Sequence, residues 1–235
     1  RSRFIGYDRF LRRYTQIGGR VCKILSPNRT GTGTLVGNDL VLTNFHVLEE
    51  IFFAPKLARS VRFHFSYSTN GVSQNPDILE CALAKESEWR LKESSYSESD
   101  ISGEGSPDPN KLDYALVKLD KNVGDEDLPN GVKRGWFNLE DIDPIVGFGD
   151  FIVVAQHPKG IDLQVAWGQI TEAQLLRLRH DATTDEGSSG ALCFNADLEP
   201  FGLHHATEPA IQGISPRYNQ CIPLRLVAAD LKVSK

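Results

Sequence analysis

Three short motifs place a histidine, an aspartate and a serine beside predicted β-strands. His46 follows the apolar run 40–43, and Asp113 directly precedes the alternating run 114–119. Ser189 lies in a glycine-containing loop. A serine hydroxyl becomes a nucleophile when a histidine takes its proton and a carboxylate orients that histidine. The three residue types therefore indicate acyl-transfer chemistry, provided that the fold brings them together.

The loop around Ser189 also offers backbone donors. Gly187 can adopt backbone angles that other residues avoid, so its N–H and that of Ser189 could point at one spot. Two converging N–H groups form an oxyanion hole, which stabilises developing negative charge. The apolar residues 191–194 follow at once, whereas a flexible linker is rarely followed by a buried strand.

Each motif also has an ordinary structural interpretation. A lone histidine after an apolar run, such as His46, often belongs to the core, and an aspartate before a strand, such as Asp113, is a common turn residue. The glycine and serine residues around Ser189 are also typical of flexible loops. The presence of all three motifs, divided between two halves of the chain, is what favours catalysis.

The rest of the chain predicts the β-structure that must position these residues. Short apolar or alternating runs recur between Gly, Asn, Asp and Pro, which is typical of barrels and sandwiches. Residues 37–39 predict a hairpin turn. The predicted strands cover residues 20–25, 32–36, 40–43, 61–67, 79–84, 114–119, 151–156, 163–171, 175–179, 191–195, 201–205 and 220–223.

Two segments have helical spacing and one has the composition of a loop. Residues 7–14 and 224–233 place apolar residues on one helical face. Residues 92–110 are crowded with Ser, Glu, Asp, Gly and Pro, which predicts a long unstructured surface loop.

Composition and charge argue against several function classes. The chain has 235 residues, of which 40% are hydrophobic and 24% charged, and its formal net charge is -5. This balance suits a soluble globular protein and predicts no nucleic-acid partner. No run approaches the ~18 apolar residues of a membrane helix, so we expect no membrane partner. The chain starts at Arg1 and lacks methionine, so we expect further domains of a longer parent protein.

The cysteines favour a reducing compartment. Cys22, Cys81, Cys193 and Cys221 are far apart, form no CxxC pair and lie in apolar contexts. We therefore expect buried free thiols, a cytoplasmic location, no metal site and no other cofactor.

Together the motifs resemble those of the trypsin-like serine protease superfamily. Residues 42–46 resemble its histidine signature, residues 113–119 its aspartate strand and residues 187–190 its nucleophile loop. The resemblance covers about residues 18–232. Residues 31–37, with the sequence Gly-Thr-Gly-Thr-Leu-Val-Gly, resemble the intracellular bacterial branch, which includes domains fused to effector-associated or signalling modules.

The resemblance implies an all-β fold of two six-stranded antiparallel β-barrels, with the active site between them and a helix at the C-terminal end. It implies a serine endopeptidase acting on protein or peptide substrates. Ser189 would attack the scissile carbonyl, and His46 would take the serine proton and later give it to the leaving amine. Asp113 would hold His46, and the N–H groups of Gly187 and Ser189 would bind the oxyanion.

The expected domain organisation follows from this resemblance. A basic, partly helical leader or linker covers residues 1–17, and the protease domain covers 18–235. Its N-terminal barrel spans about 18–110, its C-terminal barrel about 111–223 and its final helix about 224–233.

Two positions depart from the secreted members of the family. Ser188 stands where those members have an aspartate that pairs with a newly cut N-terminus, and Val47 stands where a cysteine is common. The resemblance therefore implies an enzyme that is not activated by such a cut, and is either made active or switched by its parent protein.

The specificity pocket of the family includes residues just before the nucleophile, here Thr183 and Thr184. A threonine at 183 disfavours a simple preference for Arg or Lys. His204 and Thr184 resemble pocket residues of staphylococcal glutamyl endopeptidases, and a histidine with a hydroxyl can bind a carboxylate. One hypothesis is therefore cleavage after Glu or Asp. The alternatives are a core histidine beside an apolar or aromatic pocket, and a protease-like scaffold held in a latent state.

Overall fold

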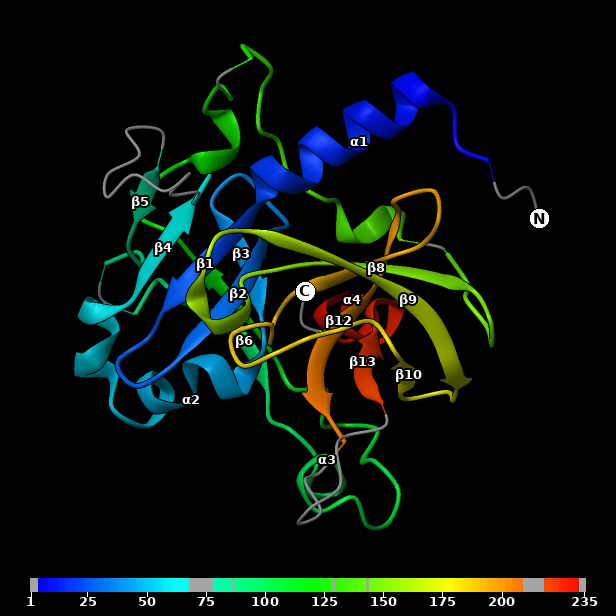
Figure 1. Ribbon diagram of the computed structural model, residues 1–235. Coiled ribbons are helices and arrows are strands. Elements are labelled where there is room, and N and C mark those ends of the chain that lie inside the picture. Colours follow the sequence, from blue (N-terminus) through cyan, green and yellow to red (C-terminus); the bar gives the residue numbers. More distant parts are fainter. Residues whose placement is uncertain are drawn as a thin grey trace.

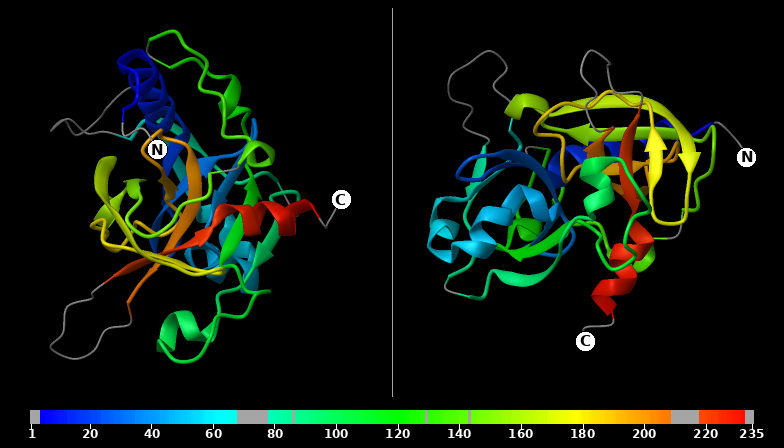
Figure 2. Two further views of the ribbon diagram at one scale, coloured as in Figure 1. Left: turned by 90° about the vertical axis from the view of Figure 1, so that its right-hand side faces the viewer. Right: turned by 90° about the horizontal axis from the view of Figure 1, so that it is seen from below.

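Two antiparallel β bodies lie side by side, with helices around their edges (Figure 1). The computed structural model describes residues 4–67, 78–85, 87–128, 130–142, 144–208 and 218–232. The right-hand view of Figure 2 shows the same two bodies from below. The fold is mostly β, as predicted.

The N-terminal body is a sheet of seven strands within the described residues, in the order β5-β4-β1-β2-β3-β7-β6. Only the isolated bridge between Leu83 and Leu119 brings the chain after β5 back to the end of β7. The strands are β1 (Val21–Leu25), β2 (Thr30–Leu35), β3 (Leu40–Thr43), β4 (Arg62–Phe65), β5 (Leu79–Cys81), β6 (Arg90–Ser94) and β7 (Tyr114–Lys118).

The predicted closed six-stranded barrel is therefore wrong for this half. A seventh strand, β6, joins one edge of the sheet, and its partner is β7 alone. In the part of the chain that the structure describes, no ladder joins the edge strands β5 and β6, so this sheet is not closed. The sheet also extends past residue 110, where the N-terminal barrel was expected to end, because β7 pairs with β3.

The C-terminal body is a closed barrel of six strands in the described part of the chain, in the order β10-β13-β12-β11-β8-β9. This confirms the predicted second barrel. The strands are β8 (Phe151–Gln156), β9 (Gln164–Ala173), β10 (Leu178–His180), β11 (Leu192–Phe194), β12 (Pro200–Thr207) and β13 (Asn219–Pro223).

Strand alternation divides the apolar side chains among three clusters. In β8, Ile152 and Val154 point into the barrel, while Val153 and Ala155 face the other body. The shared cluster between the bodies, here called the junction cluster, holds the two halves in one arrangement. Its buried members are Ile17, Val21, Val36, Leu42, Leu112, Tyr114, Val153, Ala155, Leu192, Phe194, Leu198, Leu203, Ile222, Leu224 and Val227.

Four α-helices lie at the edges of the described β bodies (Figures 1 and 2). They are α1 (Tyr7–Arg20), α2 (Phe45–Phe53), α3 (Glu98–Ser102) and α4 (Leu224–Lys232). Short 3₁₀ turns cover Pro55–Ser60, Val123–Asp125, Leu139–Asp141 and Pro158–Gly160. Helix α1 is longer than the predicted 7–14, and α2 was not predicted.

The segment predicted as an unstructured loop, residues 92–110, is partly ordered. It contains the end of β6 and the whole of α3. The side chains of Ser97 and Asp100 form a capping box at the start of α3. Asp100 also pairs with the buried Arg177. The prediction failed because this order comes from a partner far along the chain, which local composition cannot show.

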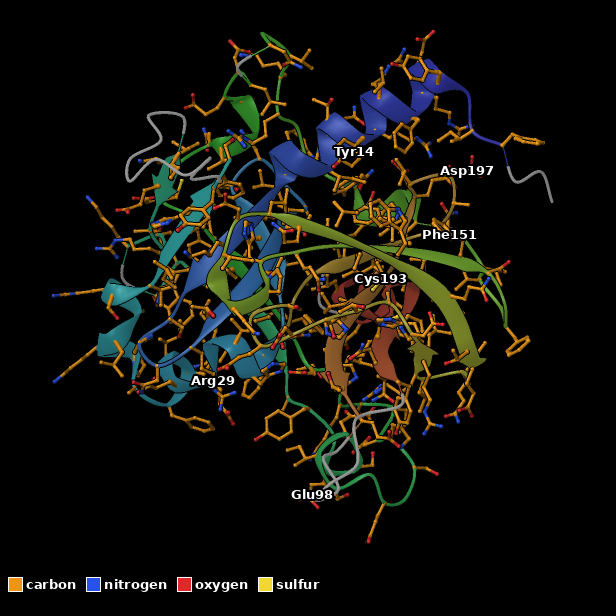
Figure 3. The ribbon with its side chains drawn as sticks, viewed as in Figure 1. Tyr14, Arg29, Glu98, Phe151, Cys193 and Asp197 are labelled. Atoms are coloured by element: carbon orange, nitrogen blue, oxygen red, sulfur yellow. The ribbon has the colours of Figure 1, made fainter. Side chains whose placement is uncertain are left out.

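The basic residues of α1 bind carboxylates of this same chain. Arg9 and Arg13 pair with Glu199 in the hairpin after β11. Figure 3 shows Tyr14 of α1 and Asp197 of that hairpin on the same side of the molecule. Part of the positive charge of residues 1–17 is therefore paired with a carboxylate elsewhere in the chain.

All four cysteines are buried and free, as predicted. Cys193 lies inside the C-terminal barrel (Figure 3). None of the helices in the described residues is both long and apolar enough to cross a membrane.

The barrel interior has no room for a side chain at residue 202. An added Cβ on Gly202 would lie 2.7 Å from Sγ of Cys221. We expect Gly202→Ala to lower the free energy of unfolding by about 1–3 kcal/mol, because overpacking a filled core forces neighbours to move. Urea unfolding measures this. Gly147 has open space around it, so Gly147→Ala is the matched control. Equal stability of the two variants would contradict the packing argument.

Candidate functional site

The register of two strands brings His46 and Asp113 together. Thr43, the last residue of β3, pairs with Ala115 near the start of β7. The chain therefore leaves β3 for α2 at the point where it enters β7. His46, in the first turn of α2, places Nδ1 2.8 Å from Oδ2 of Asp113. Its backbone N–H donates to Oδ1 of the same carboxylate at 3.1 Å.

The Asp113 carboxylate is buried and held from several sides. Only 1% of the residue is exposed, and its φ of 41° lies in a region that Asp tolerates better than most residues. Asn44 donates to its backbone carbonyl at 2.7 Å, and Nδ1 of His205 lies 3.3 Å from Oδ2.

These contacts keep Asp113 ionised. Burial acts to raise the pKa of its carboxyl, but the charge of His46 and the hydrogen bonds of His205 and His46 outweigh burial and lower the pKa to about 2. An ionised carboxylate can only accept, so Nδ1 of His46 carries the proton. Nε2 of His46 is then free to accept one.

The Ser189 loop packs against the strand ends that carry His46. The carbonyl of Ser189 accepts from the N–H of Thr32 at 2.8 Å. Gly190 has a φ of 88°, and an added Cβ would lie 2.3 Å from Oγ1 of Thr43. Only glycine fits this approach. Ser189 itself is half-buried, and its Oγ makes no hydrogen bond to His46 within the described residues.

Gly187 has the backbone geometry that the sequence analysis expected. Its φ is 91°, and an added Cβ would lie 2.6 Å from the carbonyl oxygen of His157. The hydroxyl of Thr32 donates to the Gly187 carbonyl at 2.8 Å and accepts from the N–H of His157. The N–H groups of Gly187 and Ser189 donate to no acceptor in the described part of the protein. Two free donors therefore flank the serine.

Ser188 stabilises this turn from inside. It is fully buried, and its hydroxyl accepts from the N–H of Asp185 at 3.0 Å. Ser188, at the position where secreted members of the family have an aspartate, therefore holds the turn that precedes Ser189.

The expected pocket residues lie next to the serine loop. His204 accepts from the N–H of Gly190 through its carbonyl, at 3.0 Å. The backbone carbonyl of Thr183 accepts from the side chain of Gln156 at 2.8 Å, and Thr183 is exposed. Oγ1 of Thr184 is buried and has no hydrogen-bond partner among the described residues. Residues 209–217 lie outside the described residues.

A second histidine, which the sequence analysis missed, packs against His204. The rings of His180 and His204 form an edge-on contact with centroids 5.5 Å apart. Burial lowers the pKa of His180 to about 4. Burial, with the nearby His180, His205 and His46, holds the pKa of His204 well below its ordinary value. Nδ1 of His204 and both ring nitrogens of His180 lack a partner of normal hydrogen-bond geometry among the described residues.

The sequence analysis also missed His205, which contacts Asp113. His205 is the extra residue where the register of β12 against β13 shifts, since His204 pairs with Cys221 and Ala206 with Gln220. Two successive histidines in a predicted strand were the available signal. Beside His46, a hollow of about 240 Å³ opens between the two bodies, and Tyr96, Ile101 and His205 are among its lining residues. Arg29, labelled in Figure 3, borders it and donates to the His46 carbonyl.

The described residues contain no cluster of three or more His, Cys, Asp and Glu side chains arranged to hold a metal ion. Among them, His46 and Asp113 form a histidine–carboxylate pair of the kind that can accept and return a proton.

Comparisons with known proteins identify a family and a fold. A family model described as a trypsin-like peptidase domain matches residues 31–203. The uncharacterized protein y4fB of Sinorhizobium fredii is 27% identical over 215 residues, which cover 85% of this chain and 29% of that protein. The chain thus spans less than a third of the length of this curated relative.

Several solved structures share the fold. A serine endoprotease from Yersinia pestis is 17% identical with a TM-score of 0.62, over 98% of this chain and 66% of that one. Deg5 is 15% identical with a TM-score of 0.60, over 94% and 91% of the two chains. The inactive form of a serine-to-alanine mutant of Rv3671c from M. tuberculosis is 16% identical with a TM-score of 0.59, over 94% and 89%.

Protonation of Asp113 should remove part of the protein's stability. The folded pKa of about 2 lies below the unfolded value, so the carboxylate contributes stability above about pH 4 that is lost as pH falls through the folded pKa. We expect the difference in unfolding free energy between wild type and Asp113→Asn to shrink between about pH 4 and pH 2. Denaturant titrations at several pH values measure it.

Exposed Asp8→Asn is the control for this series. It should change the unfolding free energy by no more than about 0.5 kcal/mol across the range. A difference for Asp113→Asn that does not vary with pH would contradict the assignment.

Proposed function

This chain belongs to the trypsin-like peptidase domain family, and from that premise we propose that it is a serine endopeptidase that cleaves protein or peptide substrates through an acyl-enzyme. The observation that carries the proposal is the contact between His46 and the buried carboxylate of Asp113. It supplies a histidine with a fixed tautomer at the edge of a hollow. The loop that carries Ser189 packs against Thr32 and Thr43, in the strands that lead to this histidine.

The proposed mechanism uses only side chains and backbone groups of this chain. Ser189 Oγ attacks the scissile carbonyl while Nε2 of His46 takes the hydroxyl proton. The carbonyl π bond opens to an oxyanion, which accepts from the N–H groups of Gly187 and Ser189. His46 then gives its proton to the leaving amine as the C–N bond breaks. A water molecule repeats the cycle on the acyl-enzyme and regenerates Ser189.

The electrostatics support this assignment of roles. Asp113 stays ionised because its carboxylate accepts three hydrogen bonds from His46 and His205. It therefore stabilises the imidazolium that forms on His46 when the proton moves. The N–H groups of Gly187 and Ser189 have no acceptor among the described residues. In the proposed mechanism the oxyanion accepts a hydrogen bond from each of them.

A serine-directed label tests the proposed nucleophile. We expect a fluorophosphonate to label the wild-type protein and to leave Ser189→Ala unlabelled, because the proposed mechanism gives the Ser189 hydroxyl a general base, Nε2 of His46. Mass spectrometry of the labelled peptide measures the outcome.

The adjacent serine is the matched control. Ser188 is buried and its hydroxyl faces Asp185, so Ser188→Ala should keep the label, at a rate lowered by less than about tenfold for one lost hydrogen bond. Labelling that survives Ser189→Ala would contradict the nucleophile. An unlabelled wild type would instead favour a protease-like scaffold in a latent state.

For the substrate, we propose cleavage after Glu or Asp, read by His204 and Thr184. Among the described residues, Oγ1 of Thr184 and Nδ1 of His204 are buried without hydrogen-bond partners, and so are both ring nitrogens of His180. Unsatisfied buried polar groups are costly, and a substrate carboxylate could satisfy some of them. Burial keeps His204 and His180 neutral in the empty pocket, so a bound carboxylate should draw a proton onto His204.

This proton uptake predicts a pH-dependent preference. The ratio of kcat/KM for a P1 Glu substrate to that for the matching P1 Gln substrate cancels the steps common to both. Because the pKa of His204 is held well below 6.5, its protonated fraction grows as pH falls. We expect the ratio to rise from about pH 8 to pH 6, by up to about tenfold per unit.

Two variants make this test specific. His204→Asn should abolish the rise of the Glu-to-Gln ratio at low pH. The control is His64→Asn, which removes a histidine that pairs with Glu80 and should leave the ratio unchanged. Faster turnover of Phe or Leu substrates at every pH would instead support the apolar pocket.

We further propose that the chain works as one domain of a longer cytoplasmic protein. The curated relative is more than three times as long as the part that this chain matches. The four buried free thiols suit a reducing compartment.

A further inference from the structure

A continuous line of buried polar side chains runs behind Asp113. Nδ1 of His205 lies 3.3 Å from Oδ2 of Asp113, and Nε2 of His205 lies 3.2 Å from Nε2 of Gln220. The same Gln220 amide nitrogen donates to Oδ1 of Asp100 at 3.3 Å. Arg177 holds both oxygens of Asp100, at 2.9 and 2.7 Å. The side chains of His205, Asp100 and Arg177 are 0%, 3% and 2% exposed.

The chemistry of each group gives this line a single direction. The guanidinium of Arg177 only donates, so the carboxylate of Asp100 accepts on both oxygens. Asp100 must therefore face the amide nitrogen of Gln220, because the amide oxygen would be repelled. That nitrogen also only donates, so Nε2 of His205 must accept. The ring proton of His205 is left on Nδ1, which faces Asp113.

We propose that His205 is a positioning residue for Asp113, and that Arg177, Asp100 and Gln220 hold it in the one tautomer that can donate to that carboxylate. In the other tautomer, a lone pair on Nδ1 would face the negative charge of Asp113. The Asp113 carboxylate would lose one of its three donors and one of the contacts that fix its angle to His46. This inference rests on the proposed serine endopeptidase function.

The same line connects the segment around α3 to the catalytic residues. Asp113 ends that segment, and its N–H donates to the carbonyl of Ser95 at 3.1 Å. Arg177 also donates to the carbonyl of Lys111 at 3.0 Å, so it holds both arms of the segment. In Figure 3 Glu98 marks the outer end of α3, at the lower edge of the molecule. Asp100, two residues on, is buried.

The residues of this hydrogen-bonded line come from both β bodies. His205 is in β12, Gln220 in β13 and Arg177 directly before β10, all in the barrel. Asp100 and Asp113 come from the other body and its connection. The line therefore crosses the boundary between the two bodies at the depth of the catalytic residues.

The first experiment reads the tautomer directly. Nitrogen-15 chemical shifts of the His205 ring, assigned with His205→Asn, should show a protonated Nδ1 and a bare Nε2 in the wild type. In Gln220→Met, which has a similar volume and no donor, a protonated Nε2 should appear. Gln164→Met, at an exposed position, should leave the ring shifts of His205 unchanged. A protonated Nε2 in the wild type would overturn the proposal.

The second experiment measures turnover. His205→Leu and Gln220→Met should lower kcat roughly tenfold, the effect of one hydrogen bond to a charged group, with KM changed by less than about twofold. His205→Asn, whose amide can donate to Asp113, should recover most of the loss. Equal kcat for His205→Leu and His205→Asn, in variants with native-like circular dichroism, would overturn the positioning role.

The two experiments separate the possible failures. The tautomer measurement needs no activity, so a wild type that cleaves nothing but shows a protonated Nδ1 would overturn the proposed function and leave the hydrogen-bonded line supported. Arg177 and Asp100 are left intact in these variants, because removing one partner of a buried ion pair is strongly destabilising.

Discussion

A carboxylate buried between two β bodies is the constraint on which the rest of the structure depends. Asp113 is 1% exposed, and burying an unpaired charge would be prohibitive. Donors therefore surround it: the ring and backbone of His46 from one body and the ring of His205 from the other. These donors meet at Asp113 only if β3 and β7 keep their register and the junction cluster holds the bodies together.

The serine loop meets the same boundary through backbone groups. Gly187 and Gly190 have positive φ and approach neighbouring atoms too closely for any side chain. Thr32, in β2, joins this loop to the first body. Its N–H donates to the Ser189 carbonyl, and its hydroxyl donates to the Gly187 carbonyl and accepts from the N–H of His157. The backbone of Ser189 and the side chains of His46 and Asp113, to which we assign the catalytic roles, are thus held by hydrogen bonds at this boundary. Burial lowers the pKa of His180 and of His204, so both histidines stay neutral near pH 7.

Sequence reasoning was accurate where the signal was local. Strand alternation predicted the six strands of the C-terminal barrel, and apolar surroundings predicted four buried free thiols. It was wrong about the closure of the first body and about the charged edge strand β6, which has no apolar alternation and whose residues 92–94 were taken as loop. It also missed α2, since the run from Phe45 to Phe53 followed a strand and its helical face is evident only once it packs.

The sequence by itself determined the residue types that could do chemistry, their order, and the glycine positions that only glycine can fill. Backbone freedom, strand alternation and side-chain chemistry are properties of a residue and its neighbours, so they can be inferred from the chain alone. Only the tertiary structure decided which partners each residue meets. The contacts of Asp113 with His46 and His205, and of Asp100 with Arg177, join residues more than sixty positions apart. Strand register and the packing of the two bodies set such contacts, and no local pattern encodes them.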